Sequence, residues 1–180
     1  MVHLYLAEGF EETEALGTAD VLRRGGIEVC LVSVGDGLLV RGSHGIGVMA
    51  DALFDAAEAE ASEMMIFPGG LPGTVNLGEH EGLMNVMESR VRAGKAVAAI
   101  CAAPSLLGRR HLLEGRKATC YPGFDEYLLG ATYTGNYAEV DGNLITGKGP
   151  GAVFDFALAI VEHLKGAAVA AEVKGGMLLA

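Results

Sequence analysis

Cys101 is the residue in this sequence best placed for covalent chemistry. The apolar run over residues 96–100 predicts a buried strand, and Pro104 with the leucines that follow predicts a helix, so Cys101 occupies the turn between them. The start of a helix offers free backbone N–H groups and the positive end of the helix dipole, and both favour the reactive thiolate. A sharp strand-to-helix turn of this kind exposes the nucleophile in many α/β enzymes. The alternative is an inert thiol, since free cysteines often only pack in the core.

Glu14 is the first candidate partner for this thiol. It lies in the acidic segment of residues 11–14, which the pattern places in the first turn of a helix over residues 11–24. Acidic residues are favoured there by the helix dipole, and we interpret Glu11 and Glu12 in this way. Glu14 turns inward, where partial desolvation would raise its pKa and allow it to carry a proton. Helix capping is the alternative interpretation of Glu14.

A glycine pair, Gly69-Gly70, follows the apolar run of residues 64–67 and Pro68. Glycines let the backbone approach a ligand closely and present its N–H groups. The Gly70 N–H and the N–H of Ala102, the residue after Cys101, are therefore candidates to bind a developing oxyanion. The alternative is an ordinary tight turn.

The histidines give little support for a Cys–His pair or for a metal site. None of the five adjoins the cysteine; they are His3, His44, His80, His111 and His163. His44 lies in a glycine-flanked turn from which it could reach a site, although a solvated position is the simpler expectation. No two histidines have helical spacing and no acidic cluster pairs with them, so we predict no metal and no cofactor.

The predicted elements alternate between strands and helices, which indicates an α/β fold with a mostly parallel sheet covered by helices on both faces. We expect strands over residues 2–7, 27–34, 64–67, 96–100, 118–121, 132–140 and 144–146, a hairpin over 38–49, and helices over 11–24, 82–93, 102–109, 149–164 and 167–173. Asp141-Gly142 predicts a second hairpin. In such sheets ligands bind beyond the carboxyl ends of the strands, where Glu14, Gly70 and Cys101 are expected.

Composition narrows the class of protein. The chain has 180 residues, 51% of them hydrophobic, and a net charge of −10, which fits one globular domain over residues 1–180 and argues against binding to nucleic acid or to an anionic membrane. No apolar run is long enough to span a membrane, and the N-terminus resembles a first strand more than a signal peptide. Cys30, Cys101 and Cys120 form no CxxC pair, so we expect no disulfide framework and a cytoplasmic location.

Four segments together resemble the ThiJ/PfpI superfamily, in the branch of the Parkinsonism-associated deglycase (DJ-one) and its YajL-like relatives. They are residues 7–14 (AEGFEETE), 67–70 (FPGG), 98–104 (AAICAAP), and 149–151 (GPG) with 154–162 (FDFALAIVE). The resemblance implies a flavodoxin-like three-layer sandwich, related to class I glutamine amidotransferases, and a homodimer. It also implies that Cys101 is an oxidation-sensitive nucleophile, that Glu14 is the protonated glutamate bonded to it, and that the Gly70 and Ala102 N–H groups face the substrate oxygen.

The sequence also departs from parts of that superfamily. Some relatives carry a histidine before a proline where this chain has Tyr121 before Pro122, so that acid–base histidine is missing. The protease-like branch has histidine after the cysteine, where Ala102 stands here, and His163 begins no His-x-Glu pair of the amidotransferase kind. Peptidase and amidotransferase activities are therefore not expected, and whether His44 or Tyr121 assists at the site stays open.

The resemblance leaves two main functions, both of which need a reactive Cys101. In the first, Cys101 adds to the aldehyde of a small dicarbonyl such as methylglyoxal, or to its protein adducts, and Glu14 moves a proton so that hydrolysis releases lactate. In the second, the protein is an oxidative-stress sensor or chaperone whose Cys101 oxidises to a sulfinic acid. A structural dimer with an inert thiol is the third possibility.

Overall fold

A seven-stranded sheet forms the centre of the computed structural model, which describes all 180 residues. The strands lie in the order β10 (Ala138–Asp141), β11 (Leu144–Gly147), β7 (Ala96–Ile100), β6 (Met64–Phe67), β1 (Val2–Leu6), β2 (Val29–Ser33) and β5 (Ala52–Leu53). Every neighbouring pair is parallel except β10 with β11. The expected mostly parallel sheet is therefore confirmed.

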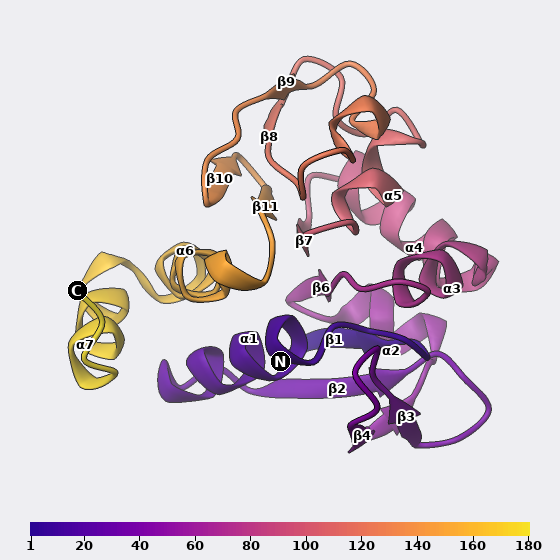
Figure 1. Ribbon diagram of the computed structural model, residues 1–180, viewed down its shortest axis with the longest axis horizontal. Helices are drawn as coiled ribbons and strands as arrows, with labels where there is room; N and C mark the ends of the chain where they lie inside the picture. Colours follow the sequence, from indigo (N-terminus) through magenta and orange to yellow (C-terminus); the bar gives the residue numbers. More distant parts are fainter.

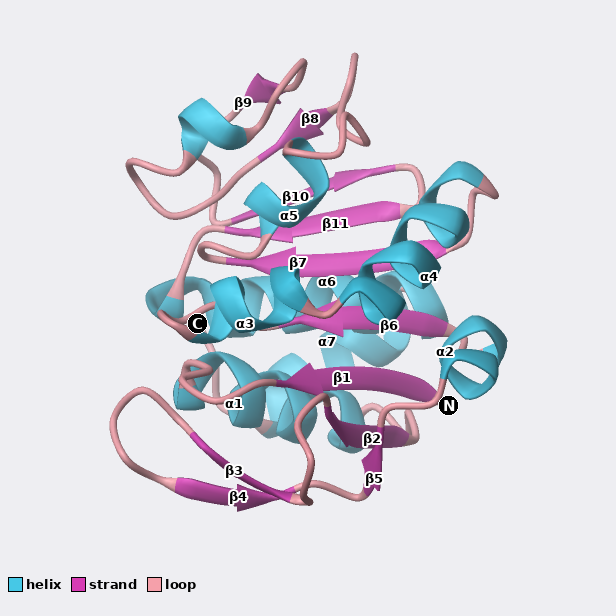
Figure 2. Cartoon of the chain, turned by 90° about the vertical axis from the view of Figure 1, so that its right-hand side faces the viewer, coloured by secondary structure: helices cyan, strands magenta, loops and turns pink.

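Helices cover both faces of this sheet (Figures 1 and 2). One face carries α1 (Glu12–Arg24), α6 (Val153–Lys165) and α7 (Ala167–Gly176), and the other carries α2 (Ala56–Ala61), α3 (Gly73–Glu79), α4 (Glu81–Arg92) and α5 (Pro104–Gly108). Two short 3₁₀ turns, η1 (Asp125–Tyr127) and η2 (Pro150–Ala152), complete the helical elements. The arrangement is the flavodoxin-like three-layer sandwich that the sequence predicts.

Strand β6 shows why the central strands are apolar without interruption. Met64 and Ile66 belong to the apolar cluster under α1 and α6, whereas Met65 and Phe67 belong to the cluster under α3, α4 and α5. All four side chains are buried, because both faces of a parallel sheet are covered. The two clusters hold 26 and 22 buried residues, so the sheet separates two cores of similar size.

Two small sheets lie outside the central one. The hairpin of β3 (Leu39–Arg41) and β4 (Gly47–Met49) confirms the prediction over residues 38–49, and β10 with β11 confirms the hairpin at Asp141-Gly142. The single strand expected over residues 132–140 is wrong. It splits into β9 (Thr132–Tyr133), paired with β8 (Lys117–Ala118), and β10, because Gly135 adopts a φ of +68° between them.

None of the helices is long and apolar enough to cross a membrane. Helix α3 was not predicted, because glycines at both ends and Pro72 before it lower its helix propensity.

Candidate active site

The candidate site lies where the strand order reverses direction. Along the chain, β1 is followed outward by β2 on one side, whereas β6 is followed by β7 and β11 on the other. In open α/β sheets such a switch point leaves a crevice at the carboxyl ends of the strands. The segments after β1, β6 and β7 carry Glu14, Gly69-Gly70 and Cys101 to this edge.

Cys101 occupies a strained turn directly after β7. Its φ of +66° lies in the left-handed region, which residues with a β-carbon rarely adopt. The turn is held on both sides, since the Cys101 N–H donates to the Gly147 carbonyl at 2.9 Å and the Cys101 carbonyl accepts from the Tyr121 N–H at 2.9 Å. This geometry confirms the predicted strand-to-helix turn and is typical of a nucleophile held in a fixed orientation.

Glu14 is fully buried beside Cys101, so the prediction that it turns inward is confirmed. One carboxyl oxygen, Oε2, accepts from the Gly69 N–H at 2.7 Å, whereas Oε1 has no hydrogen-bond partner in the chain. Burial raises the pKa of Glu14 to about 7, although the Cys101 side chain and the Gly69 N–H act in the opposite direction. A carboxyl group with this pKa can both donate and accept a proton near neutral pH.

Gly69 has a role in the site that its place in the sequence did not predict. A β-carbon at this position would lie 2.6 Å from the Cys101 Cβ and 2.8 Å from Glu14 Oε2. No side chain fits in this space, so only glycine allows the thiol and the carboxyl group to approach each other. The Gly-Gly pair was visible in the sequence, but the two neighbours that exclude a side chain were not.

The Gly70 and Ala102 N–H groups are the candidates to hold an oxyanion, and both act on the pKa of the Cys101 thiol. Burial nevertheless raises the pKa of Cys101, and the charge of Glu14 raises it further, while these two N–H groups lower it. The N–H groups therefore act in the expected direction, but burial and the charge of Glu14 outweigh them, and the pKa of Cys101 lies above its ordinary value. Cys101 is only 9% exposed, and α5 begins three residues later and is only five residues long.

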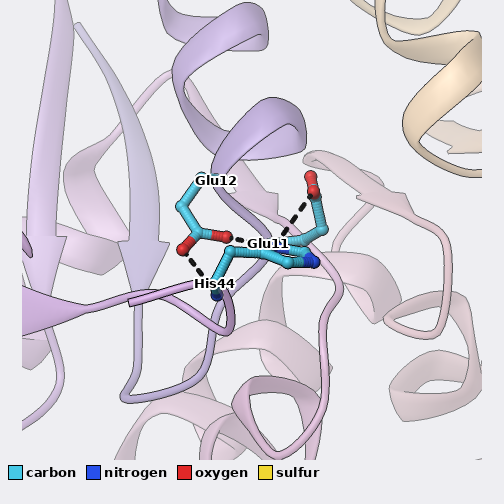
Figure 3. Close-up of side chains that lie close together, drawn as sticks. All are labelled: Glu11, Glu12 and His44. Atoms are coloured by element: carbon cyan, nitrogen blue, oxygen red, sulfur yellow. Dashed lines mark hydrogen bonds and ion pairs between the residues drawn. The ribbon is translucent and has the colours of Figure 1, made fainter. Parts of the chain in front are cut away.

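Glu11, Glu12 and His44 form a cluster at the start of α1 (Figure 3). The His44 Nδ1 lies 2.8 Å from Glu12 Oε2, and the His44 N–H donates to Glu12 Oε1 at 2.7 Å. No acidic cluster beside a histidine is expected from the sequence, and this prediction is wrong because the β3–β4 hairpin folds back onto α1. Burial opposes the charge on Glu12, but the hydrogen bonds from His44 and the backbone outweigh it and lower the pKa of Glu12 to about 2.

This cluster forms a clamp, in which hydrogen bonds connect the β3–β4 hairpin to α1. Glu11 caps the helix by accepting from the Glu14 N–H at 2.6 Å, so Glu11 and Glu12 do more than complement the helix dipole. The three ligand atoms lie within 4.8 Å of one another, which is the spacing of a metal site, yet hydrogen bonds within the chain already use both carboxylates. The hydrogen-bond partners of the His44 side chain are Glu12 and Ser43, and Glu11 Oε1 lies 3.9 Å from its Nδ1; Cys101 is not among its partners.

Tyr121 lies beside Cys101, since its N–H donates to the Cys101 carbonyl. Its ring is exposed and lines a cavity of about 270 Å³ together with Tyr137, Lys148 and Pro150.

The two remaining cysteines are free thiols. Cys120 is buried and Cys30 is half-buried.

Comparison with known proteins agrees with this architecture. A model of the DJ-1/PfpI family matches residues 1–163. Protein DJ-1 homolog B of Arabidopsis thaliana is 40% identical over 97% of this chain, which spans 40% of the length of that relative. Glutathione-independent glyoxalase DJR-1.2 of Caenorhabditis elegans is 32% identical over 88% of this chain and 85% of its own length. Oxidized DJ-1 of Toxoplasma gondii, a solved structure, superposes with a TM-score of 0.92 at 33% identity over 99% of this chain and 98% of its own. The chain belongs to the DJ-1/PfpI family.

Proposed function

We propose that the protein converts small dicarbonyl compounds such as methylglyoxal, or their protein adducts, to hydroxy acids without a cofactor. The observation that carries this proposal is the buried Glu14 carboxyl group beside Cys101, whose Oε1 has no hydrogen-bond partner in the chain. The activity named for the Caenorhabditis elegans relative supports the same class of reaction.

The chemistry begins with one proton shared between two buried acids. Because the charge of Glu14 raises the pKa of Cys101, the thiolate becomes accessible when Glu14 holds the proton. The sulfur attacks the aldehyde carbon, and Glu14 gives its proton to the carbonyl oxygen, so that a hemithioacetal forms. The Gly70 and Ala102 N–H groups stabilise the negative charge that develops on this oxygen during the attack.

Glu14 then acts as a base. Its carboxylate removes the proton from the carbon that bears sulfur and hydroxyl, which gives an enediolate. The hydroxyl proton passes to the oxygen of the former ketone, and Glu14 returns the proton it holds to the former ketone carbon, so that the carbon bearing sulfur becomes the thioester carbonyl. The product is a thioester of lactate on Cys101. Water hydrolyses the thioester, releases lactate and restores the thiol, so atoms and charge balance without metal or redox cofactor.

Lactate formation from methylglyoxal tests this proposal. We expect Cys101→Ala and Glu14→Gln each to lower kcat/KM by about 10³-fold or more, as is usual when a nucleophile or its proton carrier is removed. Cys30→Ala is the matched control, because Cys30 is a free thiol outside the site. The mechanism is wrong if either site variant keeps the wild-type rate.

Oxidation sensing at the same thiol is the second candidate function, and the oxidized Toxoplasma gondii structure favours it. Here a peroxide would take Cys101 to a sulfinic acid, with Glu14 donating a hydrogen bond to it. Intact mass after graded peroxide separates this role from the first. Oxidation of Cys30 or Cys120 before Cys101, or a Cys101 that stays reduced, would exclude it.

We further propose that residues 1–180 form one domain and that the protein is cytoplasmic and forms a homodimer. Exposed apolar side chains on the β3–β4 hairpin, namely Leu39, Ile46 and Met49, support self-association. Sedimentation velocity at micromolar concentration tests this, and a monomer would contradict it.

A further inference from the structure

A second cavity lies between α3 and α5, and neither Cys101 nor Glu14 lines it. Its volume is about 280 Å³, at the small end of the range for ligand pockets. Both helices lie on the same face of the sheet and follow directly after the glycine pair and the elbow (Figure 2). The apolar part of its wall includes Leu71, Leu106 and Phe124, so it offers an aromatic or aliphatic group a place to pack.

Thr74 brings an unused polar group to this wall. The residue is only 4% exposed, and its Oγ1 has no hydrogen-bond partner. A buried hydroxyl without a partner costs free energy, so a ligand that accepts a hydrogen bond from it would be favoured. The neighbouring Ser105 hydroxyl differs, because it already donates to the Ala102 carbonyl at 2.6 Å.

Two arginines supply positive charge at the same place. Arg109 and Arg110 both line the cavity, and neither forms an ion pair with a carboxylate of the chain. Arg109 lies over the Tyr127 ring at 4.2 Å from its centroid, which leaves the N–H edge of the guanidinium available. Glu79 is the one carboxylate in the wall, so the lining carries two positive side chains and one negative one. The protein as a whole has a net charge of −10.

We propose that this cavity binds a small organic anion, a carboxylate or phosphate attached to an apolar group. The anionic head would accept hydrogen bonds from the guanidinium of Arg110 and from the Thr74 hydroxyl, since arginine binds both kinds of oxyanion through two parallel N–H groups. The apolar part would pack against Leu106 and Phe124. The argument for this site does not rest on the reaction proposed above, because neither Cys101 nor Glu14 lines the cavity.

Four probes separate the features of the ligand by isothermal titration of the full chain. Phenyl phosphate and benzoate carry both an anion and a ring, inorganic phosphate carries only the anion, and phenol only the ring. We expect the first two to bind at least about tenfold more tightly than the last two. Backbone amide shifts in residues 71–79 and 104–110 should report the site. Equal affinity for phenol or for inorganic phosphate, or no binding by both ring-bearing anions, overturns the proposal.

Two variants then test the named contacts. Arg110→Gln should weaken phenyl phosphate binding about tenfold or more, and Thr74→Val, of nearly the same shape, about threefold to tenfold. Arg24→Gln is the matched control, because it removes the same charge from an exposed pair with Asp20 outside the cavity. Thr74→Val should also raise the melting temperature of the unliganded protein, which separates a loss of binding from a loss of folding. Equal binding by Arg110→Gln and Arg24→Gln contradicts the assignment.

Discussion

Replacing Gly69 by alanine would test whether the function of the site depends on the close approach of Cys101 to Glu14. The new Cβ would lie 2.6 Å from the Cys101 Cβ, 2.8 Å from Glu14 Oε2 and 3.1 Å from the Ala102 nitrogen. Carbon atoms in contact prefer a separation of about 3.5–4.0 Å, so the groups must move apart by about 1 Å. Cys101 cannot yield easily, because backbone hydrogen bonds to Gly147 and Tyr121 hold its turn.

The expected losses follow from this displacement. Overpacking costs about 1–3 kcal/mol of stability, and a shift of about 1 Å in a reacting group lowers the rate about 10²-fold. The Gly69 N–H also lowers the pKa of Glu14, so distorting its hydrogen bond should move the Glu14 titration above its starting value of about 7. The substitution therefore changes stability, rate and titration together.

Three measurements check this prediction. Urea unfolding gives the stability, lactate formation gives kcat/KM, and alkylation of Cys101 from pH 5 to pH 9, followed by peptide mass spectrometry, gives the titration. Gly175→Ala in α7 is the matched control, because its Cβ would meet nothing within 4 Å. If Gly69→Ala keeps both the wild-type rate and the wild-type alkylation profile, the packing argument for this site is refuted.

The remaining predictions concern other parts of the molecule. Burial raises the pKa of Glu14 to about 7 from an unfolded value of about 4.5, so its stabilising contribution is present below pH 4.5 and is lost as the pH rises through 7. This loss of stability is on the order of 3 kcal/mol. Urea unfolding from pH 4 to pH 8 should show it in the wild-type protein, and Glu14→Gln should make the stability less dependent on pH. Glu12→Gln should return the raised pKa of His44 towards its ordinary value in an NMR titration and speed hydrogen exchange of the His44 and Ile46 amides, whereas unchanged exchange would exclude the clamp. Arg90 is 1% exposed and donates to the carbonyls of Ala59, Glu60 and Glu63, so Arg90→Met should destabilise the protein by about 3 kcal/mol, while Arg92→Met on the exposed face of the same helix should cost less than about 1 kcal/mol. Equal costs for these two arginine variants would contradict the assigned role of Arg90.

Local patterns were sufficient for the strands that carry the site. The apolar runs at residues 64–67 and 96–100 predict β6 and β7 with the bounds that the structure has, and Cys101 after the second run predicts the elbow. Both are properties of a few consecutive residues, because a strand buried on both faces needs an uninterrupted apolar sequence. The inward turn of Glu14 likewise follows from its place in one helix.

Contacts between distant segments could not be predicted in this way. Gly69 matters because of Glu14, which lies 55 residues away and is brought to it by the pairing of β1 with β6. Glu12 meets His44, 32 residues later, only because the β3–β4 hairpin folds back onto α1. In each case the role of the residue depends on a tertiary contact, which a pattern of neighbouring residues in the sequence cannot predict.

The left-handed backbone at Cys101 has a consequence for how this protein is expected to change over time. A residue with a β-carbon in that conformation costs about 1–2 kcal/mol, which glycine or asparagine would largely avoid. Selection for stability alone would therefore disfavour cysteine at this position and favour glycine or asparagine. A descendant in which the thiol no longer served a purpose should drift to glycine there, whereas the hydrophobic residues of β6 and β7 should persist because the fold itself requires them.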